Sequence, residues 1–359
     1  MIPSNFGFRL AKETWGKSFR GTKSAKSEND RGVRYLKGSD AVKNQKKAAK
    51  CFAAAAVDGF IPAIFNLGRC YLNGTGVKKD EAQGIKYYLK AAHAGYAPAQ
   101  HGLGYYYSGH KKEKLGVHYY TLAAKQKFIN SVCNLGDCYY EGTGVKQNLK
   151  KAAQYFKLGV SLGDEICINN LGWFYQNGYT VKKDLKKAVI LYKRSAAMKC
   201  SGAYESLGYL YAHGIGVKQD FAQAKMLFKK SIAEDKDAYS QAELGLIYEN
   251  EWRMDEAVSL YKSSAAQGNG TGQYLLANHY SKNKNDLAKS QKYYKLAVAS
   301  LEKDVKAYNA NGNEMFYLAQ CYEHGLGVAR NPKKARYYYE MAVAHGYRDG
   351  AVAIEDLAA

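Results

Sequence analysis

A glycine-rich loop followed by lysine is the first feature of this sequence that could do chemistry. Residues 67–80 read LGRCYLNGTGVKKD, and glycine-rich turns with a lysine are what nucleotide sites use to hold phosphate. A phosphate loop has the spacing GxxxxGK[ST] and follows a strand, and neither feature is present. The segment also returns at residues 135, 171, 207 and 318. A phosphate site is needed once or twice in a protein, so the repetition predicts a structural turn.

No other residues form a catalytic or metal-binding set. Cys321 and His324 are spaced to share one face of a helix, but two ligands do not close a metal site. There is no HExxH motif, and nothing resembles a set of nucleophile, base and acid. We therefore expect a protein that is not an enzyme, with no catalytic residue, no metal and no cofactor.

The repeated segment organises nearly the whole chain, with a period of about 36 residues. Within a unit, Ala63, Leu67 and Tyr71 share one helix face, and the stretch 83–95 gives a second apolar stripe that ends at glycine. Each unit thus predicts two helices. The nine copies begin at residues 31, 67, 103, 135, 171, 207, 244, 276 and 318.

The loop between the two helices can be interpreted residue by residue. Gly74 and Gly76 supply positive φ angles for a tight reversal, and Val77 is an apolar plug. Asp80 has the position and type of an N-cap for the second helix. The corresponding caps in other copies are Asn148, Asp184, Asp220 and Asn331.

The consensus AxxxLGxxYxxGxGVxxDxxKAxxYYxxAAxxG resembles that of the Sel-one-like repeats, relatives of the tetratricopeptide repeats. The resemblance is most specific at 63–95, 131–163, 167–199, 203–235 and 314–346. It implies an all-α fold, a right-handed α-solenoid of about nine antiparallel helix pairs, and the function of an adaptor for protein complexes. The expected organisation is a basic segment at 1–26, the solenoid at 27–346 and a capping half-repeat at 347–359.

In such a solenoid the first helices line a concave surface, where two positions beside the Leu-Gly pair are the most exposed. We expect a protein or peptide to bind there, as tetratricopeptide clamps bind peptides through Asn, Lys and Arg. The alternative is that some of these Asn side chains bond neighbouring turns or cap helices. The predicted partner-binding stripe is Asn66, Arg69, Tyr105, Asn134, Asp137, Asn170, Trp173 and Tyr209. Residues 300–312 insert extra length, and insertions in solenoids usually lie on loops that bind partners.

Basic charge is concentrated in the first part of the chain. The net charge is +21, and all of the excess lies within residues 1–200. This favours an acidic protein partner; the alternatives are an RNA-associated or organellar assembly factor and a merely solvated surface. The lysines near the loops are expected to align in a basic ridge: Lys78, Lys79, Lys150, Lys151, Lys182 and Lys183.

Seven cysteines without disulfide or zinc spacing predict free thiols and a reducing intracellular compartment, first of all the cytoplasm. Cys51, Cys70, Cys138 and Cys321 occupy core columns of the repeat. No run of apolar residues is long enough to span a membrane. The N-terminus has no secretory signal, but its basic and aromatic residues leave a mitochondrial presequence as an alternative to a docking tail.

Overall fold

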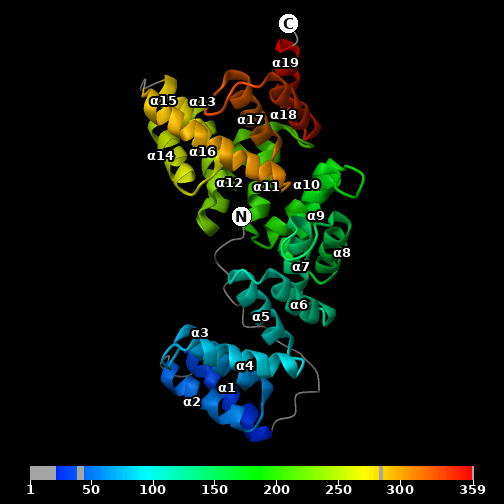
Figure 1. Cartoon of the computed structure of the whole chain (residues 1–359), viewed down its shortest axis with the longest axis vertical. Helices are drawn as coiled ribbons and strands as arrows, with labels where there is room; N and C mark the ends of the chain where they lie inside the picture. Colours follow the sequence, from blue (N-terminus) through cyan, green and yellow to red (C-terminus); the bar gives the residue numbers. More distant parts are fainter. Residues whose placement is uncertain (1–21, 39–43, 283–285, 358–359) are drawn as a thin grey trace. The chain divides into compact units, whose positions relative to one another are not determined.

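Paired helices make up the whole described part of the chain, as the repeat period predicts. The structure is a computed structural model that describes residues 22–38, 44–282 and 286–357. These residues form nine helix pairs followed by a short nineteenth helix, with no strand among them (Figure 1). The predictions for residues 1–21, including the presequence, lie outside the described residues. None of the described helices is long and apolar enough to cross a membrane.

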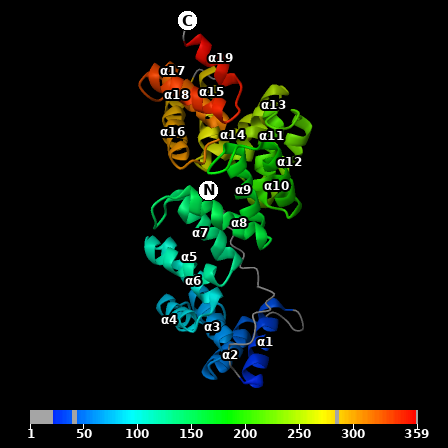
Figure 2. The ribbon, with the colours of Figure 1, turned by 90° about the vertical axis from the view of Figure 1, so that its right-hand side faces the viewer.

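The chain divides into two compact units at Asp164 and Glu165. In the first unit each helix packs most closely against its partner in the pair and then against the next pair (Figure 2). Helix α1 begins inside the segment that the sequence assigns to a separate N-terminal region. The helices of this unit are α1 (Lys23–Lys37), α2 (Gln45–Val57), α3 (Ile61–Asn73), α4 (Glu81–His93), α5 (Ala97–Gly109), α6 (Glu113–Lys125), α7 (Ile129–Glu141) and α8 (Leu149–Ser161).

The second unit has the same pairing, with one long helix, α16. Its first helices also contact one another: α11 packs on α13, α13 on α15 and α15 on α17. The helices are α9 (Glu165–Asn177), α10 (Leu185–Ala197), α11 (Ser201–His213), α12 (Phe221–Asp235), α13 (Ala238–Asn250), α14 (Met254–Ala266), α15 (Gly270–Lys282), α16 (Leu287–Lys306), α17 (Gly312–His324), α18 (Pro332–Ala344) and α19 (Asp349–Asp356).

Seven of the nine described pairs are locked by an aromatic ring that lies on a glycine, and in the last two pairs alanine, Ala277 or Ala319, occupies the glycine position. A Cβ added to Gly68 of α3 would lie 2.8 Å from the Cδ1 atom of Tyr88 on α4. Gly208 and Phe228 repeat this relation at 2.6 Å in the second unit. Glycine is required here because any side chain would push the ring, and the helix that carries it, out of contact.

The loop chemistry predicted from the sequence is confirmed. Gly74 ends α3 in the left-handed region at φ 69°, and its N–H donates to the carbonyl of Cys70. The carboxylate of Asp80 accepts the backbone N–H of Gln83 at 2.9 Å and so caps α4. The same bond recurs at the other predicted caps, Asn148, Asp184, Asp220 and Asn331.

The insertion at 300–312 is not the exposed loop that the sequence predicts. Residues up to Lys306 extend α16 to 20 residues, and Leu301 is fully buried. The extra turns are helical because they carry an apolar face that packs into the core of the second unit.

Candidate binding surfaces

The predicted stripe is divided between the two units. Asn66, Arg69, Tyr105, Asn134 and Asp137 lie on α3, α5 and α7 of the first unit. Asn170, Trp173 and Tyr209 lie on α9 and α11 of the second. Each unit therefore has to be considered as a separate surface.

Two residues of the predicted stripe are not available to a partner. The amide of Asn66 is buried and donates from Nδ2 to Oδ1 of Asn29 at 2.9 Å, in the preceding helix pair. Tyr209 is 1% exposed, and its hydroxyl accepts the N–H of Gly312 at 3.1 Å. The prediction is wrong for both, because their polar groups bond other repeats, the preceding pair for Asn66 and the distant helix α17 for Tyr209.

The remaining stripe residues of the first unit reach the surface. Tyr105 is 51% exposed on α5, while Arg69, Asn134 and Asp137 are half-buried on α3 and α7. Burial, with the neighbouring carboxylates of Glu141 and Asp164, raises the pKa of Asp137 to about 7. Asp137 is thus partly protonated near neutral pH and is a weak source of negative charge.

The interior of the second unit holds a buried polar network that sequence analysis missed. Glu243 is 1% exposed and accepts from Asn313 Nδ2 at 2.7 Å, while its other oxygen lies 3.0 Å from Nε2 of His213. The hydroxyl of Tyr239 donates to Oδ1 of Asn313 at 3.0 Å. These bonds join α11, α13 and α17 in the interior of the unit. The signal in the sequence was Glu243, an acid in a column that holds Asn or Ser in four other copies.

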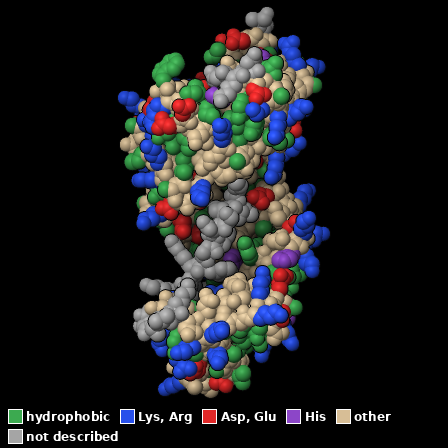
Figure 3. Space-filling model, turned by 90° about the vertical axis from the view of Figure 1, so that its left-hand side faces the viewer, with side chains coloured by type: hydrophobic (Ala, Val, Ile, Leu, Met, Phe, Trp, Pro, Cys, Tyr) green, Lys and Arg blue, Asp and Glu red, His purple; other side chains and the backbone are tan. Residues whose placement is uncertain are grey.

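The lysines of the predicted basic ridge are exposed, and the ridge itself remains a prediction. Lys78, Lys79 and Lys150 are exposed and form no ion pair in the described part of the first unit. The ammonium of Lys151 lies 4.9 Å from the centre of the Tyr139 ring. One face of the molecule shows Lys and Arg side chains dispersed among other residues, not in one block (Figure 3).

In the second unit the two ridge lysines differ from each other. Lys182 is exposed. Lys183 donates from Nζ to the carbonyl of Ala344 at 2.6 Å, and burial lowers its pKa. Lys183 is also exposed, but its ammonium group is engaged at the end of α18.

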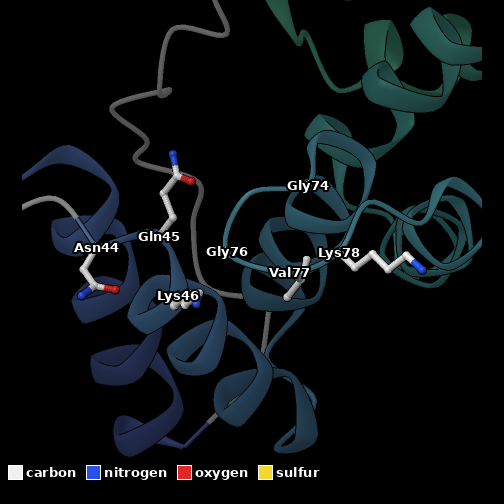
Figure 4. A pocket seen from close by; sticks show the side chains of 7 residues that line it. All are labelled: Asn44, Gln45, Lys46, Gly74, Gly76, Val77 and Lys78. Carbon is white, nitrogen blue, oxygen red and sulfur yellow. The ribbon is translucent and has the colours of Figure 1, made fainter.

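A shallow cleft of about 710 Å³ lies beside the glycine-rich loop at residues 74–78 (Figure 4). This loop is not a phosphate loop. A Cβ on Gly76 would lie 2.0 Å from the carbonyl oxygen of Gln45, so this glycine is needed where one helix pair packs on the next. The cleft, called here the α2 cleft, is lined by Asn44, Gln45, Lys46, Gly74, Gly76, Val77 and Lys78.

One pair of side chains resembles a nucleophile and its base but is closed to substrate. Nδ1 of His101 lies 2.9 Å from the hydroxyl of Ser131. His101 is 2% exposed and Ser131 is fully buried. Burial lowers the pKa of His101 to about 4, so the ring is neutral and acts as a core hydrogen-bonding group.

The cysteines behave mainly as packing residues. Cys51, Cys70, Cys138 and Cys321 are buried free thiols, as their columns predict. Burial raises the pKa of Cys321 to about 12, and His324 is turned toward Glu323 at 3.6 Å, so this pair forms no metal site. Cys200 is also free, whereas Cys133 and Cys167 are not, so the expectation of free thiols fails for these two.

Stacked pairs of helices throughout the described residues define the class of this protein: a helical-repeat protein, a class whose members generally act as scaffolds for other proteins. The model of the Sel1 repeat matches eight segments and more than half of the chain. The chain belongs to the Sel1 repeat family, whose fold is typically non-catalytic. The matched segments are 25–58, 61–96, 97–128, 130–164, 166–200, 201–236, 238–269 and 315–347.

Two solved structures show the same fold. The protein c5321, a protective antigen of uropathogenic Escherichia coli with an SLR fold, is 28% identical with a TM-score of 0.58, over 93% of this chain and 79% of its own. A Sel1 repeat protein from Oxalobacter formigenes is 32% identical with a TM-score of 0.56, over 58% of this chain and 88% of its own. Comparison with curated proteins finds no match.

Proposed function

We propose that this protein is a non-catalytic scaffold whose first unit holds an acidic protein segment on the side of its first helices. The contacts would come from Arg69 on α3, Tyr105 on α5 and Asn134 on α7. These side chains occupy neighbouring columns on successive repeats and are exposed or half-buried, so one extended segment can pass over all three. The observation that carries the proposal is Tyr105, whose ring is 51% exposed on this side although tyrosines in the repeat mostly pack inward.

The chemistry of the three side chains suits a peptide. Arg69 supplies a guanidinium for a carboxylate, and Asn134 supplies an amide that can bond a peptide backbone. An exposed tyrosine offers a large contact area with little loss of rotamer freedom on binding. In the second unit, Tyr209 of the stripe is buried and bonded to Gly312 at the start of α17, so the first unit is the part that we expect to bind.

Charge favours an acidic segment over a neutral one. The described residues of the first unit contain 22 Lys and Arg against 9 Asp and Glu. The exposed lysines Lys78, Lys79, Lys150 and Lys151 add to the attraction without contacting the segment, and such long-range attraction raises the association rate. The same charge is compatible with RNA, which the experiment below distinguishes.

The test is quantitative affinity capture from the native source with the full chain, in the presence and absence of nuclease. The triple variant Arg69→Ala/Tyr105→Ala/Asn134→Ala is expected to lose the principal protein partner, with no effect of nuclease. The matched control is Lys86→Ala/Lys90→Ala, which removes two exposed positive charges from α4 outside the stripe. Equal capture of the partner by the wild type, the triple variant and the control variant contradicts the proposal. Loss of the partner on nuclease treatment favours the RNA-associated alternative.

A further inference from the structure

Four carboxylates of the second unit lie around α11. They come from α11 itself, the end of α12, the cap of α13 and the part of α16 that the insertion adds. Packing does not require an acid on α11, because the position of Glu205 holds Phe65 or Tyr274 in other copies of the repeat. The four side chains are half-buried, and we name them the α11 acidic surface: Glu205, Asp235, Asp237 and Asp304.

The carboxylates of the α11 acidic surface are close enough to act on one another. Burial, with the carboxylates of Asp237, Glu314 and Asp235, raises the pKa of Glu205 well above its usual range. Burial and the carboxylate of Asp304 likewise raise the pKa of Glu314, a buried residue of α17, which links the α16 carboxylate to the same group. Grouped carboxylates repel one another, and a cation placed among them would relieve that repulsion.

None of the four carboxylates forms an ion pair with a described residue of the second unit. Burial raises the pKa of Asp304, although the exposed Lys303 is its neighbour in the sequence. Asp237 caps α13 through a backbone N–H, and Oδ2 of Asp235 accepts from Ser201 Oγ at 2.5 Å. Oδ1 of Asp235 is buried and accepts no hydrogen bond among the described residues. A buried carboxylate oxygen without a donor points to a donor that lies outside these residues.

An exposed aromatic side chain follows the α16 carboxylate of this surface. Tyr308, four residues after Asp304, is 40% exposed, and its ring centre lies 5.7 Å from that of Tyr179. The chain turns back between them, because the N–H of Asn309 donates to the carbonyl of Asp304 at 2.9 Å. Aromatic faces attract Lys and Arg, so carboxylates beside a tyrosine suit a ligand segment that is both basic and aromatic.

The chain contains such a segment in residues 1–21, which lie outside the described residues. One acid, Glu13, stands among four cations and four large aromatic side chains: Arg9, Lys12, Lys17 and Arg20, with Phe6, Phe8, Trp15 and Phe19. The first unit would repel this segment, since its described residues hold 22 Lys and Arg against 9 Asp and Glu. The α11 acidic surface of the second unit is its electrostatic complement.

The length of residues 1–21 permits this docking within one molecule. A chain of this length extends over about 70 Å, whereas four helix pairs stacked at about 10 Å span about 40 Å. The segment can therefore pass along the whole stack of the first unit, at whose first helix, α1, it is attached. Attachment to the same chain gives it a high effective concentration, which favours an intramolecular contact over one with a free ligand.

We propose that residues 1–21 dock on the α11 acidic surface of the same molecule. The Lys and Arg side chains of the segment pair with the four carboxylates, and one of its aromatic side chains contacts Tyr308. The contact is separate from the peptide site on the first unit, so its failure in an experiment leaves the proposed scaffold function untouched.

Limited cleavage of the native full-length protein by trypsin tests the docking. Mass spectrometry gives the rate of cleavage after each Lys and Arg of residues 1–21, and a free peptide of this sequence gives the reference rate. We expect cleavage in the protein to be at least about tenfold slower, because trypsin attacks only the undocked fraction. Cleavage as fast as in the free peptide overturns the proposal.

Variants of the surface show whether its carboxylates cause the protection. Glu205→Gln/Asp304→Asn removes two charges with little change of shape and should bring cleavage within residues 1–21 close to the peptide rate, with unchanged cleavage elsewhere in the chain. Asp304→Asn alone, the milder variant, should give part of this increase. The matched control is Asp255→Asn/Glu340→Gln, which removes two exposed carboxylates of the same unit. Full protection in both surface variants overturns the proposal.

Cross-linking with a carbodiimide, which joins an amine directly to a carboxylate, identifies the docking surface. Lys12 or Lys17 should be linked to a carboxylate of the α11 acidic surface. In an equimolar mixture of isotopically heavy and light protein, each linked pair of peptides should be wholly heavy or wholly light. Mixed pairs would assign the contact to a second copy, and links to the first unit would place the segment there; either result overturns the proposal.

Discussion

Asn313 donates its amide to Glu243, 70 residues earlier in the chain, and the bond of 2.7 Å is fully buried. This relationship ties α17 to α13 across the intervening helices. The other carboxylate oxygen of Glu243 lies 3.0 Å from Nε2 of His213, and an alanine in place of Asn313 would leave one carboxylate oxygen without a donor.

We expect Asn313→Ala to lower the free energy of unfolding of the second unit by about 1–3 kcal/mol, the usual cost of an unsatisfied buried polar group. Urea denaturation followed by circular dichroism measures this loss in the free energy of unfolding. Asn309→Ala is the control, since Asn309 is exposed at the end of the same connection. Equal stability of the two variants would show that the network contributes nothing.

The second unit should lose stability as pH rises through neutrality. Burial, with the nearby carboxylate of Asp304, raises the pKa of Glu314 to about 8. The folded state therefore holds a proton that the unfolded state releases near the ordinary glutamate pKa. Stability is greatest below that value and declines as pH approaches 8, with a slope of at most about 1.4 kcal/mol per pH unit for this group.

Glu314→Gln should make the pH dependence shallower, because the amide stays neutral and still accepts the N–H of Asn311. Burial also raises the pKa of Asp237 and Glu205, so part of the decline remains in the variant. The measurement is the urea midpoint between pH 5 and pH 9. An identical slope in variant and wild type would contradict the assignment.

Gly76→Ala should be markedly more destabilising than Gly59→Ala. Both glycines have positive φ, 74° and 72°, and pay the same backbone penalty of about 1–2 kcal/mol as alanine. A Cβ on Gly76 also meets the carbonyl of Gln45 at 2.0 Å, while none lies within 4 Å at Gly59. Thermal unfolding of the two variants separates the two effects, and equal losses would remove the argument for a close-packed joint.

Cys70, Cys138 and Cys321 should resist alkylation in the native protein. All three are buried, and burial raises the pKa of Cys138 and Cys321 to about 12, so almost no thiolate exists at neutral pH. Mass spectrometry after brief exposure to iodoacetamide, with and without urea, gives the protection of each thiol. Rapid labelling without urea would show that these columns are not core.

The helix pairs, their caps and their core columns were all predictable from the sequence, because they depend on contacts within one period. Asp80 needs only Gln83 to cap α4, and Gly68 needs only Tyr88 of the same pair. Repetition of these short-range relations along the sequence also excludes a phosphate loop. Nine copies of the same local pattern identify the paired helices with little ambiguity.

The accessibility of the stripe was decided by the tertiary structure alone. Asn66 is buried in a hydrogen bond with Asn29, and the hydroxyl of Tyr209 is bonded to Gly312, more than a hundred residues away. These contacts depend on how neighbouring repeats approach one another and on the added turns of α16, which the period does not encode. The sequence by itself determined the paired-helix fold; the packing of distant repeats determined which of its polar columns remain exposed, because burial is a property of the assembled helices and not of any one of them.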